Sequence, residues 1–166
     1  MKPQGFTLVE VLVVLVILGL TVTFTTLGFQ RLEDDRLQKQ AGHLSSWLQS
    51  VSDNAVLDSA VYGAWLNPAG DRLETGYYHN NRWWKVRGDE ARSERIEEGF
   101  SLWIEDGDGW RALIPSSKKK VLKEPDILFM PTGLSVPETF QLRQDHDRKA
   151  LIERDENGLY TWGLLQ

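Results

Sequence analysis

The stretch GFTLVEVLVVLVILGL, residues 5 to 20, determines the expected fold of the whole chain. From Phe6 to Phe29 the sequence is almost entirely apolar, and Glu10 is the one charged residue within it. As an α-helix rising about 1.5 Å per residue, this segment would be roughly 36 Å long. That length exceeds the ~30 Å hydrocarbon layer of a bilayer. The sequence therefore predicts a membrane-spanning helix over residues 6–29 that carries a carboxylate.

Two ordinary explanations leave Glu10 unexplained. A secretory signal peptide needs a basic start, a short apolar run and a cleavage site after that run. Here only Lys2 precedes the run, and Glu10 interrupts it. A plain membrane anchor fits the length, but an acidic residue at a helix centre costs about 2.5–3.5 kcal/mol on insertion scales. An ionisable residue inside a membrane segment is generally functional and has a partner.

The run Gly5-Phe6-Thr7-Leu8-Val9-Glu10, followed by an apolar helix, closely resembles the class III signal of type IV pilins and pseudopilins. In that family a prepilin peptidase cuts between the glycine and the phenylalanine and methylates the new amino terminus. The resemblance implies a leader of residues 1–5, cleavage between Gly5 and Phe6, and N-methylation of Phe6. It covers about the first 25 residues.

The same resemblance implies a role for Glu10, which becomes the fifth residue of the mature chain. The family uses this position for assembly. Cleavage creates a cationic amine on Phe6, and axially offset helices in a filament would bring Glu10 of one subunit to the Phe6 amine of its neighbour. A charge pair in low dielectric is strong, and an unpaired member is penalised.

Charges on either side of residues 6–29 predict the orientation. Lys2 and the amine precede the span, whereas Arg31 and Arg36 follow it among three acidic residues, Glu33, Asp34 and Asp35. A basic excess favours the cytoplasmic side. We therefore expect a single-pass bacterial inner-membrane protein with a cytoplasmic N-terminus and a periplasmic C-terminal domain.

A second apolar pattern follows the span in residues 30–59. Steps of four and three residues are typical of an amphipathic helix, and they connect Leu37, Ala41, Leu44, Leu48, Val51 and Ala55. Polar residues such as Gln38, Lys39 and Ser45 are expected on the other faces. One helix is predicted from about residue 6 to residue 59, with its second half packed on a globular domain.

Residues 60–166 show the alternation and turn residues of a β-rich domain. Expected strands cover 61–66, 73–79, 82–87, 99–105, 110–114, 126–130, 138–144, 150–154 and 159–164. Together with the long helix they predict an α+β, pilin-like fold in which the helix packs on an antiparallel sheet.

Residues 127–133 and 139–143 resemble the late strand–turn–strand of minor pseudopilin H of type II secretion. This likeness implies a structural subunit of the periplasmic pseudopilus that drives protein export, with no enzymatic activity. It implies prepilin peptidase, the major pseudopilin and other minor pseudopilins as partners, with secreted proteins as further candidates. The alternatives are a minor type IV pilin for pilus assembly or DNA uptake, and an unprocessed, membrane-tethered periplasmic domain.

The other candidate residues have simpler explanations. The 166-residue chain has no cysteine, and its net charge of −5 argues against nucleic acid as a partner. No cofactor is expected.

Asp106 and Asp108 fit a hairpin turn, while metal binding at this pair stays open. Solvated or locally bonded positions are expected for His43, His79 and His146. The basic cluster Lys118, Lys119, Lys120 and Lys123 is expected to be a solvated loop, with an electrostatic contact to an acidic neighbouring subunit or secreted protein as the alternative. Trp83 and Trp84 should face opposite sides of a strand, which makes one of them a candidate contact for a partner.

Overall fold

The computed structural model describes residues 8–86, 93–115, 124–144 and 148–165, with the backbone alone for residues 22–33. The chain divides into two compact units between Arg36 and Leu37. One helix, α1, runs from Leu8 to Leu57, as its continuous apolar pattern predicts. Eleven strands lie among the described residues after it: β1 Tyr62–Leu66, β2 Arg72–His79, β3 Arg82–Lys85, β4 Ser93–Arg95, β5 Phe100–Asp106, β6 Gly109–Ala112, β7 Ile127–Phe129, β8 Ser135–Val136, β9 Thr139–Gln144, β10 Arg148–Arg154 and β11 Tyr160–Leu165.

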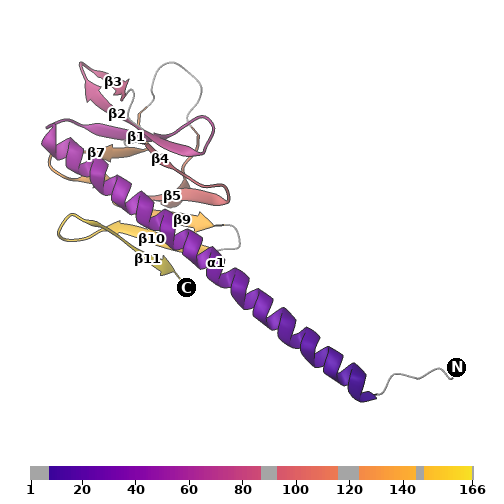
Figure 1. Ribbon diagram of the computed structural model, residues 1–166. Helices are drawn as coiled ribbons and strands as arrows, with labels where there is room; N and C mark the ends of the chain where they lie inside the picture. The colour runs from indigo at the N-terminus through magenta and orange to yellow at the C-terminus, as the bar shows by residue number, and fades with distance from the viewer. Residues whose placement is uncertain (1–7, 87–92, 116–123, 145–147, 166) are drawn as a thin grey trace. The chain divides into compact units, whose positions relative to one another are not determined.

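The strands of the second unit form two antiparallel sheets rather than one (Figure 1). The first sheet has the order β3-β2-β1-β7-β8, and β4 pairs with β2 beside this path. The second has the order β11-β10-β9-β5-β6. The pairing of β1 with β7 joins segments far apart in the sequence. The expected α+β, pilin-like architecture is confirmed, with the sheet content divided in two.

The predicted apolar stripe of α1 forms one wall of the core. Its six members, Leu37, Ala41, Leu44, Leu48, Val51 and Ala55, are all buried. Opposite them lie Phe129 of the first sheet and Phe140 and Ile152 of the second, which are also buried. Each fully buried leucine or phenylalanine contributes about 1.5–3 kcal/mol relative to an exposed one. The stripe therefore joins both sheets into one core.

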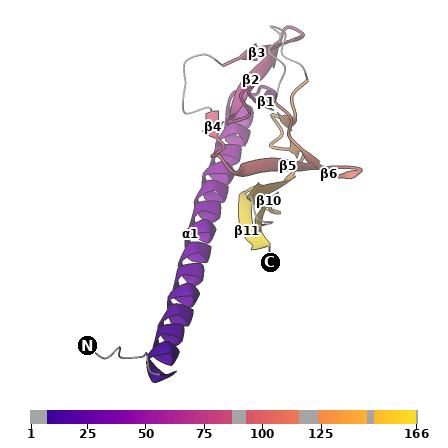
Figure 2. The ribbon, with the colours of Figure 1, turned by 90° about the vertical axis from the view of Figure 1, so that its right-hand side faces the viewer.

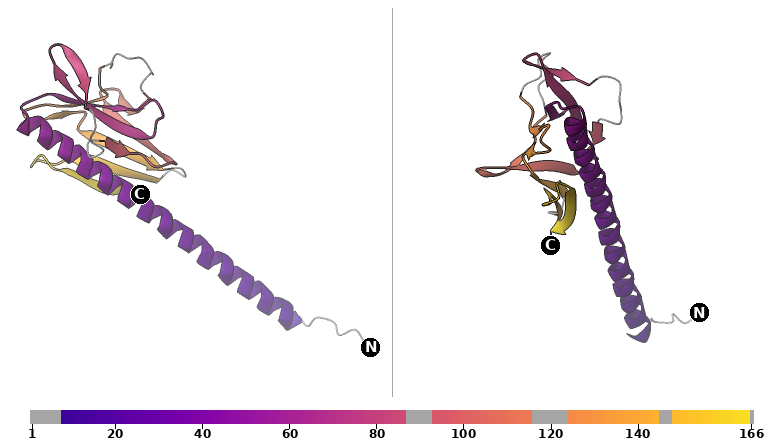
Figure 3. Two further views of the ribbon diagram at one scale, coloured as in Figure 1. Left: turned by 45° about the horizontal axis from the view of Figure 1, so that its top comes forward. Right: turned by 90° about the vertical axis from the view of Figure 1, so that its left-hand side faces the viewer.

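Polar side chains of α1 also hold an edge strand of each sheet. Gln40 is buried; its Nε2 donates to the Arg95 carbonyl at 2.7 Å, and its Oε1 accepts from the Glu97 amide at 3.3 Å. These bonds fix the segment that begins with β4, which lies beside α1 in Figures 2 and 3. Backbone groups that are partly shielded from water gain from such partners.

The second edge strand is held in the same way. The Ser45 hydroxyl donates to the Tyr160 carbonyl at 2.6 Å, and the Tyr160 amide donates to Gln49 Oε1 at 3.0 Å. Ser45, which was expected on a face other than the apolar stripe, is nevertheless buried against the start of β11. An i, i+3, i+4 stripe does not show how wide the covered face is.

Turn chemistry fixes the hairpins. Asn80 and Asn81, which connect β2 and β3, have φ values of 49° and 61°, as two-residue hairpin turns require. Asp106 pairs with Gly109 across the β5–β6 turn, and its carboxylate accepts from Arg111 Nε at 3.0 Å. The predicted hairpin at these acidic residues is confirmed.

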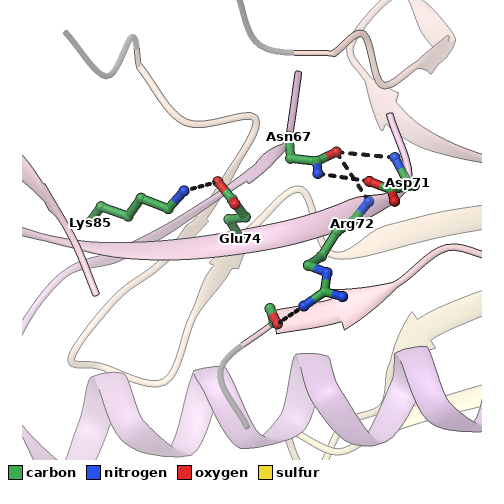
Figure 4. Close-up of polar contacts among 6 residues, drawn as sticks. Asn67, Asp71, Arg72, Glu74 and Lys85 are labelled. Carbon is green, nitrogen blue, oxygen red and sulfur yellow. Dashed lines mark hydrogen bonds and ion pairs between the residues drawn. The ribbon is translucent and has the colours of Figure 1, made fainter. Parts of the chain in front are cut away.

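Asn67 organises the turn between β1 and β2, as Figure 4 shows. Its Oδ1 accepts from the amides of Asp71 and Arg72, and its Nδ2 donates to Asp71 Oδ1 at 2.7 Å. Asparagine side chains commonly replace backbone partners in this way. The turn sets the β1–β2 register that aligns Tyr62 with Tyr77.

Candidate functional site

Glu10 lies in the first turn of α1 and is exposed. Around it the helix presents exposed apolar side chains, including Leu8, Val9 and Leu12. A carboxylate in a first turn interacts favourably with the helix dipole. An extended apolar surface around it marks a site that binds lipid or another protein. Glu10 is thus an anionic residue on a surface suited to apolar neighbours.

The cleavage and methylation residues, Gly5 and Phe6, lie outside the described residues. Within the described part of the chain, no helix has a stretch both long and apolar enough to cross a membrane.

Trp83 and Trp84 occupy opposite faces of β3, as predicted. Trp83 packs edge-on against Trp65, with ring centroids 5.4 Å apart, and is partly buried. Trp84 is 46% exposed. Its register partner on β2 is Tyr77, whose own partner on β1 is Tyr62. Trp84 is therefore the tryptophan of this pair that can reach a partner.

Of the three histidines, His43 lies on α1 and His79 ends β2, whereas His146 lies outside the described residues. His43 is close to Glu94, which accepts from Gln40 at 3.3 Å. Burial raises the pKa of the Glu94 carboxyl, and His43 and the Gln40 hydrogen bond offset part of that rise. This polar group holds β4 against the helix. Sequence reasoning missed this group, because Gln40 and Glu94 are 54 positions apart in the chain.

The other candidate sites of the sequence are distributed over different parts of the chain. Among the described residues, no three histidine or acidic side chains gather closely enough to hold a metal ion. The basic cluster at residues 118–123 lies outside the described ranges.

Comparison with known proteins identifies the family. Residues 1–26 match the family described as prokaryotic N-terminal methylation motif. The type II secretion system protein H of Pseudomonas aeruginosa is 31% identical over 147 residues, which cover 84% of this chain and 81% of that protein. This chain belongs to the type II secretion system protein H family. The corresponding protein of Aeromonas hydrophila is 29% identical over 167 aligned positions, covering 95% of this chain and 91% of its own length.

Solved structures support the protein H fold. The minor pseudopilin EpsH from the type 2 secretion system of Vibrio cholerae superimposes with a TM-score of 0.54 at 19% identity. The superposition covers 78% of this chain and 95% of EpsH. The chain is thus a minor pseudopilin H of type II secretion, a structural protein and not an enzyme. This membership decides for secretion over the type IV pilus alternative.

Proposed function

We propose that this protein H is processed between Gly5 and Phe6, methylated on Phe6, and built into a periplasmic pseudopilus through Glu10. The proposal places residues 6–29 in the inner membrane, the N-terminus in the cytoplasm and residues 60–166 in the periplasm. Prepilin peptidase, the major pseudopilin and the other minor pseudopilins are the proposed partners, with secreted proteins as further candidates.

The observation that carries the proposal is the position of Glu10. Its carboxylate lies in the first turn of α1 among exposed apolar residues. The match of residues 1–26 to the methylation motif supports processing. Processing would create an amine on Phe6, four residues before Glu10. Four residues of helix span about 6 Å. Methylation keeps the amine cationic, so a neighbouring subunit can offer Glu10 an opposite charge at similar depth in the bilayer.

The energetics favour assembly over the isolated subunit. An acidic side chain near the middle of a membrane helix costs about 2.5–3.5 kcal/mol, and a position closer to the headgroups costs less. A neighbouring ammonium offsets this cost and fixes the axial register between the two helices. Glu10 therefore tolerates membrane insertion and gains its partner on assembly.

Mass spectrometry of the mature chain tests processing. We expect a chain that starts at Phe6 and carries one added methyl group. A Gly5→Leu variant should keep its leader, since a bulky side chain replaces the glycine at the cleavage site. An intact Met1 in the wild type, or a cut beyond Gly19, would contradict the proposal.

Replacement of Glu10 by glutamine tests assembly, because it removes the charge with little change in shape. We expect Glu10→Gln to insert into the inner membrane normally but to be absent from the sheared pseudopilus fraction. Asp35→Asn, which removes an exposed acid farther along α1, is the matched control and should be incorporated. Normal incorporation of Glu10→Gln would refute the charge-pair role.

A further inference from the structure

An open pocket of about 650 Å³ lies where the end of α1 meets β1 and the β2–β3 hairpin. Its walls include the rings of Tyr62, Tyr77 and Trp84, and Asp58 lies at the helix side. The proposed pairing at Glu10 does not involve this pocket, which belongs to the second unit.

The three rings form one row across three strands. Tyr62 of β1 lies opposite Tyr77 of β2, which in turn lies opposite Trp84 of β3. Residues directly opposite in antiparallel strands project from the same face, so all three rings belong to one face of the sheet. The Tyr62 and Tyr77 ring centroids are 6.5 Å apart with planes tilted by 49°. Tyr62 is buried, whereas Tyr77 and Trp84 are 36% and 46% exposed.

One hydrogen bond fixes the orientation of the outer ring, Trp84. The Trp84 indole N–H donates to the His79 carbonyl at 3.1 Å. This bond uses the indole's donor and ties the ring to its own hairpin. The indole therefore presents an ordered apolar surface with a negative π-face.

The side of the pocket formed by the end of α1 carries negative charge. Asp58 follows the last residue of α1, and the Tyr62 hydroxyl donates to its Oδ2 at 2.5 Å. A carboxylate has further acceptor positions beyond one such bond. The C-terminal end of a helix is itself partially negative. The last turn of α1, which the structure describes in full, contains no basic residue.

The lysine at the pocket does not neutralise this charge. Lys85 follows Trp84 in the strand, so its side chain belongs to the opposite face of the hairpin. There its ammonium pairs with Glu74 at 2.5 Å, as Figure 4 shows. On the aromatic face, the Asp58 carboxylate and the partially negative end of α1 are the negative groups at the pocket.

We propose that this pocket binds the cationic side chain of an arginine or lysine presented by a protein partner of the secretion apparatus. Aromatic faces attract a guanidinium or ammonium group, and a carboxylate at the rim supplies its counter-charge. Arginine suits the site best, because its planar guanidinium stacks on a ring while it donates to a carboxylate. A protein is the proposed source because a pseudopilin acts by contacting other proteins; to that extent the inference rests on the proposed function.

Nuclear magnetic resonance of the mature full-length chain in detergent micelles tests the chemistry. The tryptophan indole signals are followed during titration with acetyl-Gly-Arg-Gly-amide and with its citrulline counterpart, which is neutral and of nearly the same shape. We expect the Trp84 signal to shift and saturate with the arginine peptide only. Asp58→Asn should weaken binding about three- to thirtyfold, the range of a charge-assisted contact. Trp84→Leu lacks the reporting indole, so its binding is followed through the signals of the arginine peptide and should be weakened by a similar factor.

Two controls keep this test specific. Asp53→Asn removes another exposed acid on α1, outside the pocket lining, and should bind the peptide as the wild type does. An unchanged signal from the buried Trp47 shows that each variant is folded. Equal responses to the two peptides, or wild-type binding by Asp58→Asn, would overturn the proposal.

A secretion assay tests whether the cation comes from a protein partner. Cells carrying Asp58→Lys should export less protein while they retain processed protein H at wild-type levels. Normal export by both Asp58→Lys and Trp84→Leu would overturn the assignment to a partner. Glu10→Gln should still bind the arginine peptide, so failure of the assembly proposal and failure of the pocket proposal give different results.

Discussion

Replacement of Gln40 by leucine tests the idea that α1 stabilises the domain by holding the β4 segment. Gln40 gives this segment two backbone hydrogen bonds, to the Arg95 carbonyl at 2.7 Å and from the Glu97 amide at 3.3 Å. Leucine is similar in size and prefers burial, so the variant removes the bonds and leaves the packing nearly intact. The Arg95 carbonyl and the Glu97 amide then lose their side-chain partner.

The expected loss is about 2 kcal/mol. A hydrogen bond contributes about 0.5–1.5 kcal/mol net, and about 1 kcal/mol applies to each of these two partly buried bonds. For a domain of this size, 1 kcal/mol corresponds to roughly 3 °C in the melting temperature. Gln40→Leu should therefore melt about 6 °C below the wild type.

Thermal unfolding followed by near-ultraviolet circular dichroism measures the change, and hydrogen exchange locates it. The Glu97 amide should lose protection, whereas the Tyr160 amide, which donates to Gln49, should keep it. Gln38→Leu is the control, because Gln38 is exposed on the same helix. If the two variants melt together and the Glu97 amide stays protected, the reasoning is refuted.

Three further predictions concern packing and charge. Gly63→Ala should destabilise the domain by about 2 kcal/mol in urea unfolding, because its Cβ would lie 2.7 Å from Pro125. Gly42→Ala, inside α1 and with its nearest contact at 3.6 Å, should instead stabilise it by up to about 1 kcal/mol through helix propensity. Phe140→Ala should cost about 3–5 kcal/mol in the same assay, since the ring is fully buried, and a loss below 1 kcal/mol would contradict the core described above. The raised pKa of Glu94 means that the folded state holds its proton longer than the unfolded state, so stability should fall as pH rises from about 4.5 through the folded pKa. Glu94→Gln should flatten that part of the stability curve, and an unchanged slope would exclude Glu94 as its source.

Local sequence patterns predicted the helix and most strands, because these elements depend on residues close together in the chain. The spacing from Leu37 to Ala55 identified the packed face of α1. The gap between the expected strands 73–79 and 82–87 coincides with the observed two-residue turn at Asn80 and Asn81. β4 was missed because Ser93–Arg95 has no apolar alternation; pairing with β2 and the bonds from Gln40 make it a strand. The division into two sheets depends on pairings between distant segments, which no local pattern contains.

The two candidate sites also differ in how far the sequence predicts them. Glu10 was evident from the sequence, because a single acid in a long apolar run contrasts with its neighbours. The aromatic pocket was only half predictable. The turn at Asn80 and Asn81 places Tyr77 opposite Trp84, and a local pattern can predict that pair. Tyr62 is added by the β1–β2 register, and Asp58 by the position at which α1 ends; neither is predictable from local sequence.

The hydrogen bonds that join Ser45 and Gln49 to Tyr160 span 115 and 111 positions of the chain. Contacts this remote form late and slow the search for the native state. During synthesis the face of α1 around Ser45 and Gln49 therefore stays uncovered until β11 has been made. A chain truncated before β11 would leave this face exposed, and such products should be targets for chaperones and proteases.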